Sequence, residues 1–136
     1  MEMKNFMLLW AFSLLLFGCD KKWPNRLTPK ELEIDASEHN VEIYATRKIK
    51  MIHISSTELF PNAKRSGDVN PVNGVIMYNE SWFSMRVNTN DPDSCNVIKF
   101  HIKQNELGKK RRIVFTVMGD RNFQMPVGYI IQDVQH

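Results

Sequence analysis

The hexapeptide IKFHIK at residues 98–103 alternates strictly between apolar and polar side chains. A period of two residues is typical of a β-strand that turns one face to a hydrophobic core and the other to water. The hexapeptide IVFTVM at residues 113–118 also alternates, but its second face is largely apolar as well. That pattern predicts an inner strand that is covered on both faces.

Shorter runs extend this β pattern over most of the chain. Alternation recurs at residues 32–36, 41–45, 50–53, 81–87 and 129–134, and more weakly at 75–78. β-Branched and aromatic residues cluster in these runs, and no segment of the expected domain keeps apolar residues at helical spacing for three turns. We therefore expect an all-β domain without a helix.

Turn-forming residues separate the runs at nearly regular intervals, at residues 38–40, 88–94, 105–108 and 119–122. Short strands at this spacing predict an antiparallel β-sandwich of about seven strands. Residues 59–74 are rich in proline, glycine and asparagine, and we expect them to form a long loop. A loop of that length in a compact domain is either functional or mobile.

The first nineteen residues have the pattern of a bacterial lipoprotein signal. Lys4 supplies a basic start, and the apolar segment at 6–17 has the length of a secretory signal and is too short to span a bilayer. The small Gly18 precedes Cys19 in the sequence LFGC, so we predict cleavage before Cys19 and attachment of a diacylglycerol to its sulfur, with palmitate among the acyl chains. An uncleaved signal anchor and a plain secretory signal are the alternatives.

This interpretation divides the chain into a signal peptide at 1–18, a lipidated cysteine and tether at 19–30, and one β-sandwich domain at 31–136. The expected location is the cell envelope, lipid-anchored to the outer membrane, on its periplasmic side or at the cell surface. A formal net charge of only +3 on an exported protein argues against a nucleic-acid partner. With Cys19 acylated, Cys95 is left without a disulfide partner, and we expect it to be a small buried or half-buried residue.

Sequence signals for catalysis are weak. The four histidines lack metal-binding spacing to one another or to a cysteine, and the motifs of serine hydrolases, phosphate loops and zinc proteases are missing. We therefore expect a protein that is not an enzyme and that carries no metal or cofactor. Asp91 and Asp93 flank Pro92, which predicts a turn, with a calcium site as the alternative.

Aromatic residues give better support for ligand binding. Trp82 and Phe83 are adjacent, so in a strand they point to opposite faces and at most one of them joins the core. An exposed indole would offer a sugar ring a flat apolar plate, and Tyr78, Asn79 and Glu80 would bond its hydroxyls. These five residues form the candidate binding site. The alternative is that Trp82 is the central core residue of the sandwich and Phe83 lies under a loop.

The segment NELGKKRRIVFTV at 105–117, followed by YIIQ at 129–132, resembles the closing hairpin of the BACON domain, the Bacteroidetes-associated carbohydrate-binding often N-terminal domain. Asn105, Arg112 and Gln132 fit the asparagine, the strand-opening arginine and the final glutamine of that family, and WFSM at 82–85 resembles its tryptophan-led strand. The resemblance implies an immunoglobulin-like β-sandwich in a surface or periplasmic lipoprotein. Glycan or mucin binding is proposed for the family, and a spacer role for some members.

The physical roles expected for these residues do not depend on the family. The basic cluster at 109–112 predicts a solvated turn that discourages pairing of a sheet edge with another chain. Gln132, on a terminal strand, is expected to hydrogen-bond the backbone of a neighbouring loop.

Two functions are consistent with these features, and an enzyme remains a third alternative only if folding brings a histidine and carboxylates together in a pocket. The first is a non-catalytic binding module on the envelope that recognises a glycan or a glycoprotein. The alternative is a structural or protein-interaction subunit of a cell-envelope complex, without sugar binding, which presents its loops or an edge strand to a protein partner.

Overall fold

Ten β-strands make up the described part of the chain, residues 25–57, 64–119 and 125–135 of a computed structural model. They are β1 (Leu27–Thr28), β2 (Glu31–Ile34), β3 (His39–Ala45), β4 (Met51–Thr57), β5 (Lys64–Val69), β6 (Val75–Asn79), β7 (Phe83–Asn88), β8 (Val97–Ile102), β9 (Arg111–Met118) and β10 (Val127–Gln132). Within these ranges there is no helix long and apolar enough to cross a membrane. The signal peptide predicted at 1–18 and the lipidated Cys19 lie outside the described residues.

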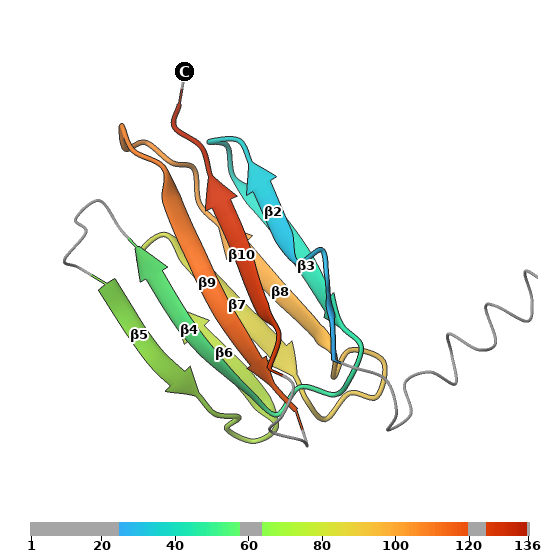
Figure 1. The fold of residues 1–136 in the computed structure, drawn as a ribbon. Coiled ribbons are helices and arrows are strands. Elements are labelled where there is room, and N and C mark those ends of the chain that lie inside the picture. The colour runs from blue at the N-terminus through green and yellow to red at the C-terminus, as the bar shows by residue number, and fades with distance from the viewer. Residues whose placement is uncertain (1–24, 58–63, 120–124, 136) are drawn as a thin grey trace, which may run out of the picture.

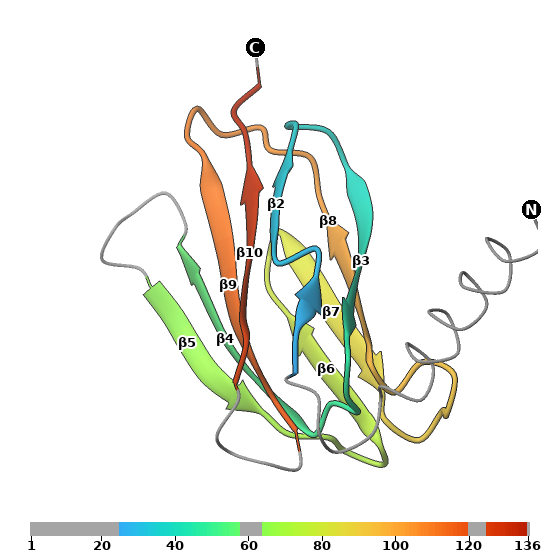
Figure 2. The same ribbon diagram turned by 45° about the vertical axis from the view of Figure 1, so that its right-hand side comes forward.

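The strands form two five-stranded sheets that pack face to face (Figures 1 and 2). Sheet 1 has the order β1-β3-β8-β7-β6, and sheet 2 has the order β2-β10-β9-β4-β5. The named strand pairings are antiparallel except that of β10 with β2, which is parallel. The prediction of an immunoglobulin-like β-sandwich is confirmed, with ten described strands in place of about seven.

Two of the additional strands lie where the sequence predicted none. β1 falls in the expected tether at 19–30, yet its Leu27 is buried and the strand pairs with β3. A single apolar residue between prolines has no period, so the pattern could not reveal it. β5 falls in the loop expected at 59–74; it is an edge strand of mostly polar sequence that pairs with β4 alone. Polar edge strands are common in natural sheets because they discourage pairing with another chain.

The core lies between the sheets and comes from the alternating residues. In β8, Ile98, Phe100 and Ile102 are buried while Lys99 is exposed. Phe100 meets Phe115 of the opposite sheet with ring centroids 5.1 Å apart. The IKFHIK and IVFTVM patterns therefore mark the middle strand of each sheet. β9 is an inner strand, as predicted, but its second face is only half-buried, at Val114, Thr116 and Met118.

Trp82 and Phe83 both join this core, at 5 % and 1 % exposure. The expectation that at most one of them would be buried is wrong, because β7 begins only at Phe83 and Trp82 lies in the bend before it. Strand alternation therefore does not apply across this pair, and the two rings meet nearly edge to face with centroids 4.6 Å apart. Neither Trp82 nor Phe83 therefore offers the exposed aromatic surface that the sugar-binding hypothesis requires.

Arg111 is a buried cation at the start of β9. Its Nε donates to Oε1 of Gln132 at 2.7 Å, its Nη2 donates to the carbonyl of Lys103 at 2.7 Å, and its guanidinium carbon lies 4.4 Å from the centre of the Trp82 ring. The prediction of a solvated basic turn at 109–112 is therefore wrong for Arg111. The strand opens at Arg111 and not at Arg112, so alternation directs Arg111 inward with Ile113 while Arg112 is exposed.

Gln132 connects this arginine to the turn between β2 and β3. Its Nε2 donates to the carbonyls of Ser37 and Lys103, both at 3.0 Å, and of Ala36 at 3.3 Å. The prediction that Gln132 bonds the backbone of a neighbouring loop is confirmed. The fully buried Asn105 extends the network through bonds from its Nδ2 to the carbonyls of Lys109 and Asp133.

Replacing Arg111 by methionine should lower the free energy of unfolding by about 3 kcal/mol. The change leaves the buried Gln132 oxygen unsatisfied, which costs roughly 1–3 kcal/mol, and it removes a cation–π contact of about 0.5–2 kcal/mol. Urea denaturation followed by tryptophan fluorescence measures the loss.

Arg112→Met is the matched control. Its side chain is exposed, so the same change of residue type should alter stability by less than about 0.5 kcal/mol. Equal losses for the two variants would contradict the core role of Arg111.

Candidate functional site

The outward face of sheet 1 carries the polar residues that alternate with the core. Arg86 of β7 and Lys99 of β8 stand opposite each other as register partners, and Lys99 stands opposite Glu42 of β3. All three side chains are exposed. Sheet 1 therefore presents a row of charged side chains on the face that points away from the core.

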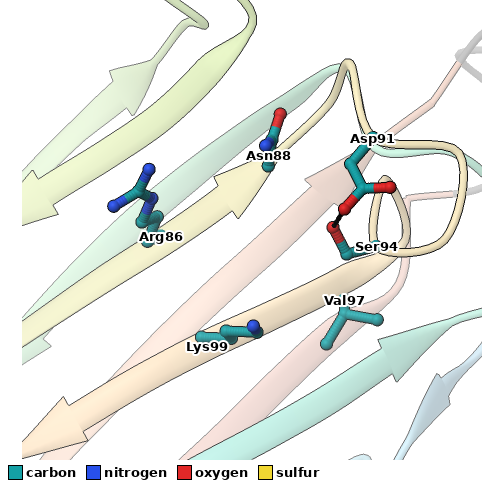
Figure 3. A pocket seen from close by; sticks show the side chains of 6 residues that line it. All are labelled: Arg86, Asn88, Asp91, Ser94, Val97 and Lys99. Carbon is teal, nitrogen blue, oxygen red and sulfur yellow. Dashed lines mark hydrogen bonds between the residues drawn. The ribbon is translucent and has the colours of Figure 1, made fainter.

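A hollow of about 290 Å³ opens at one end of this face (Figure 3). Strands β7 and β8 form its floor, and the connection between them, residues 89–96, forms its rim. It is lined by Arg86, Asn88, Asp91, Ser94, Val97 and Lys99. The lining is mostly polar, and it combines two cations with one carboxylate, one amide and one hydroxyl.

The rim is shaped by Asp91. Its Oδ1 accepts the backbone N–H of Asp93 at 3.0 Å, and its Oδ2 accepts the hydroxyl of Ser94 at 2.9 Å. These two bonds, with the charge of Lys99 adding to them, hold the pKa of Asp91 below its usual value, so it is ionised at neutral pH. The turn predicted around Pro92 is confirmed, and the described ranges contain no group of three acidic, histidine or cysteine side chains that could hold a calcium or other metal ion.

Hydrogen bonds to backbone carbonyls connect the rim to the rest of the sandwich. The side-chain amide of Asn96 donates to the carbonyl of Ala45 at 2.8 Å, and the N–H of Ile49 donates to the carbonyl of Cys95 at 3.0 Å. Cys95 itself is half-buried, as predicted. These two hydrogen bonds hold residues 95 and 96 of the rim against the segment at the end of β3.

Tyr44 provides an aromatic surface beside the hollow. It stands opposite Val97 in the pairing of β3 with β8, and residues in such positions have Cβ atoms about 5 Å apart. The tyrosine is 47 % exposed, and its hydroxyl donates to Oε2 of Glu42 at 2.7 Å. This bond raises the pKa of Tyr44 and holds the phenol in its neutral form. An exposed ring therefore lies next to the polar hollow.

The residues predicted from the sequence lie elsewhere. Tyr78 is half-buried and donates its hydroxyl to Oε1 of Glu80 at 2.5 Å, and its ring lies 5.8 Å from that of Phe83. Asn79 is exposed, but it is in register with Ser84, at the opposite end of sheet 1 from the hollow. The predicted site residues therefore lie close together, but the rings of Tyr78, Trp82 and Phe83 pack into the core and are not presented to a ligand.

Sequence reasoning missed Tyr44, Arg86 and Lys99. The signal for Tyr44 was present, because an aromatic residue at a polar position of an alternating strand, here between Glu42 and Thr46, is expected to face solvent. Arg86 and Lys99 could not be paired in advance, because their contact depends on the register of β7 with β8.

A serine, a histidine and an aspartate meet in the turn between β2 and β3, but they are not arranged for catalysis. The Ser37 hydroxyl donates to Oδ1 of Asp35, and Nε2 of His39 lies 2.7 Å from the same oxygen and 3.2 Å from the serine oxygen. In a Ser-His-Asp relay the acid and the nucleophile use different ring nitrogens, so that the histidine can accept the serine proton. Here one nitrogen meets both groups, which makes the cluster a turn motif.

The comparisons with known proteins bear on the fold. An NMR structure of a protein from Bacteroides thetaiotaomicron matches with a TM-score of 0.53 and 16 % sequence identity, over 78 % of this chain and 77 % of that one. A Bacteroides ovatus GH5 xyloglucanase in complex with a XXXG heptasaccharide gives a TM-score of 0.44 and 16 % identity over 78 % of this chain, which spans only 17 % of the xyloglucanase chain. No protein-family model and no curated protein matches the sequence. At this identity the first match supports the β-sandwich fold alone.

The Asp35 carboxyl should titrate with a midpoint near its lowered pKa of about 2, because the Ser37 hydroxyl, His39 and the Ser37 amide all bond its ionised form. The folded pKa lies below the usual value of 3.8, so ionised Asp35 favours the folded state above that pH. This contribution is lost as the pH falls from 3.8 to about 2. Carbon-13 NMR of the carboxyl group measures the midpoint.

Ser37→Ala should raise the midpoint of Asp35 toward 3.8, since it removes the largest cause of the shift. Ser94→Ala is the control, because it should raise the midpoint of Asp91 and leave Asp35 unchanged. An unchanged Asp35 midpoint in Ser37→Ala would show that the serine hydroxyl does not stabilise the carboxylate.

Proposed function

We propose that this protein is a non-catalytic, lipid-anchored, BACON-like module of the cell envelope that binds a glycan or glycoprotein through the outward face of sheet 1. The observation that carries the proposal is the exposed ring of Tyr44 beside the polar hollow. Sugar sites combine these two elements, because the C–H face of a sugar ring packs on an aromatic plate while polar groups bond its hydroxyls.

The chemistry of the hollow suits binding more than catalysis. Its lining contains no histidine or cysteine, and the hydroxyl of its serine is engaged by Asp91. Asn88 and Asp91 supply an amide and a carboxylate, and Arg86 and Lys99 supply donors, which together match the hydroxyl groups of a sugar. The hollow is open to solvent at one end of sheet 1.

The membrane anchor rests on the sequence pattern that ends at Cys19. Acyl chains contribute about 0.8 kcal/mol for each buried methylene, and stable attachment requires more than one chain or an additional signal. In the proposed arrangement only a short segment separates the acylated cysteine from β1, so the sandwich is held near the outer membrane, on its periplasmic side or at the cell surface.

Cys19→Ser should move the protein from the membrane fraction to the soluble fraction of cells that express it. The wild-type protein should begin at Cys19, with a mass increase that corresponds to its acyl chains. Membrane fractionation and mass spectrometry of the N-terminal peptide make the two measurements. An intact leader with an unmodified sulfur in the wild-type protein would overturn the anchor.

Tyr44→Ala should weaken retention of the purified lipoprotein in polysaccharide-containing gels by about tenfold, which corresponds to about 1.4 kcal/mol of lost stacking. The measurement is affinity electrophoresis in a neutral detergent over a panel of polysaccharides and mucin. Tyr129→Ala is the matched control, because Tyr129 lies on β10 in sheet 2 and is distant from the hollow in the fold. It should leave retention unchanged.

A wild-type protein that ignores every polysaccharide and mucin would contradict glycan binding. Recovery of a stoichiometric envelope protein in a pull-down would then favour the alternative function as a structural or interaction subunit. One observation supports that alternative: Met77 on the edge strand β6 is 51 % exposed, and Val72 just before it is 73 % exposed, where a partner strand has access.

A further inference from the structure

Arg86 and Lys99 face each other directly across β7 and β8 at the floor of the hollow. Like charges in directly opposite positions of an antiparallel pair repel and destabilise the sheet. Among the described residues neither side chain forms a hydrogen bond or an ion pair, although the charge of Lys99 acts on Asp91 at longer range, so their N–H donors are available to a ligand. A repulsive pair at the floor of an open hollow is stabilised when an anion binds between its members.

The nearby carboxylates Asp91 and Glu42 offset part of the positive charge of the pair, and the charge of Lys99 helps to lower the pKa of Asp91. Asp91 uses one oxygen for the Asp93 amide and the other for the Ser94 hydroxyl. Glu42, opposite Lys99 on the far side, accepts the hydroxyl of Tyr44. The residue opposite Arg86 on its other side is the uncharged Met77. Glu42 is not part of the lining, which contains two cations and one carboxylate and so keeps one positive charge in excess.

From this arrangement we infer that the hollow binds the acid group of an anionic saccharide, a uronic-acid carboxylate or a sugar sulfate, between Arg86 and Lys99. The inference rests on the proposed function and names the class of glycan that it concerns. The planar fork of an arginine matches the two oxygens of a carboxylate or sulfate, and the lysine adds a second positive charge.

The rest of the hollow orients the sugar ring. Asp91 is negative and lies on the rim, so it repels the acid group and accepts hydroxyl protons through its remaining lone pairs. Tyr44, on the Val97 side, offers the apolar plate. Ligand pockets are typically about 300–1,000 Å³, so a hollow of about 290 Å³ suits one sugar unit of a chain better than a larger molecule.

The test is affinity electrophoresis of the purified lipoprotein in neutral detergent. One set of gels contains polygalacturonate, hyaluronan or chondroitin sulfate, and the other contains the neutral polymers dextran or galactan. Retention is expected in at least one acidic gel and should weaken as salt is raised from about 0.05 to 0.5 M, because added ions screen the pair. The double variant R86Q/K99Q should lose retention by about tenfold or more.

The control variant K30Q/R112Q removes the same two charges from exposed positions outside the hollow and should keep full retention. An equal loss in both double variants would show a response to net charge and overturn the inference. Thermal unfolding of each variant establishes that it folds, which is expected because the side chains that change are exposed.

The remaining outcomes separate this inference from the proposed function. Retention in neutral gels that Tyr44→Ala weakens and R86Q/K99Q leaves unchanged would overturn the acidic ligand and leave glycan binding standing. Calorimetry with inorganic phosphate tests a free anion: binding that depends on Arg86 and Lys99, without retention in any acidic gel, would overturn the saccharide. Absence of retention in every gel would overturn both proposals.

Discussion

The buried contact between Arg111 and Gln132 is the polar constraint on which one end of the sandwich depends. Apolar packing of Ile, Val and Phe side chains holds two sheets together but does not specify how the connecting turns lie. The guanidinium and the side-chain amide supply that information, because they bond carbonyls from the β2–β3 turn and from Lys103 after β8. The ring of Trp82 covers this buried contact by packing against the guanidinium of Arg111. Three segments distant in sequence are thereby fixed by two side chains.

The two ends of sheet 1 have different roles: the end at Arg111 is structural, and the other end carries the candidate site. Strand β8 ends near the Arg111 network and begins at the hollow, and β7 runs the opposite way beside it. At the network end, Trp82 is needed in the core and is not available to a ligand. At the other end, the 89–96 connection forms the rim of the hollow, and the outward side chains of Arg86 and Lys99 are exposed. The same pair of strands therefore stabilises the domain at one end and presents the candidate site at the other.

The sequence predicted the elements whose pattern is local and missed those that depend on contacts distant in sequence. The IKFHIK and IVFTVM periods identified β8 and β9 because one buried face requires period two. Arg111 was misplaced because a basic run looks solvated until the first residue of the strand is known. Trp82 was misjudged because β7 begins at Phe83, two residues later than the predicted start at Ser81. The site formed by Tyr44, Arg86 and Lys99 depends on register across three strands, which no single stretch contains.

The entry point of the chain links the proposed anchor to the candidate site. β1 joins the edge of β3 with Thr28 opposite Tyr44. The backbone N–H of Thr46 donates to the carbonyl of Arg26, and the N–H of Arg26 donates to the Thr46 hydroxyl. The chain therefore enters the sandwich at the end that carries the 89–96 connection and the hollow. Six residue steps from Cys19 to Asn25 span at most about 20 Å. With Cys19 acylated, the hollow would stay close to the membrane, so a ligand on a polymer fixed to the same envelope would meet it more readily than a long polymer arriving from solution. A tether lengthened by flexible residues would remove this restriction without altering the site itself.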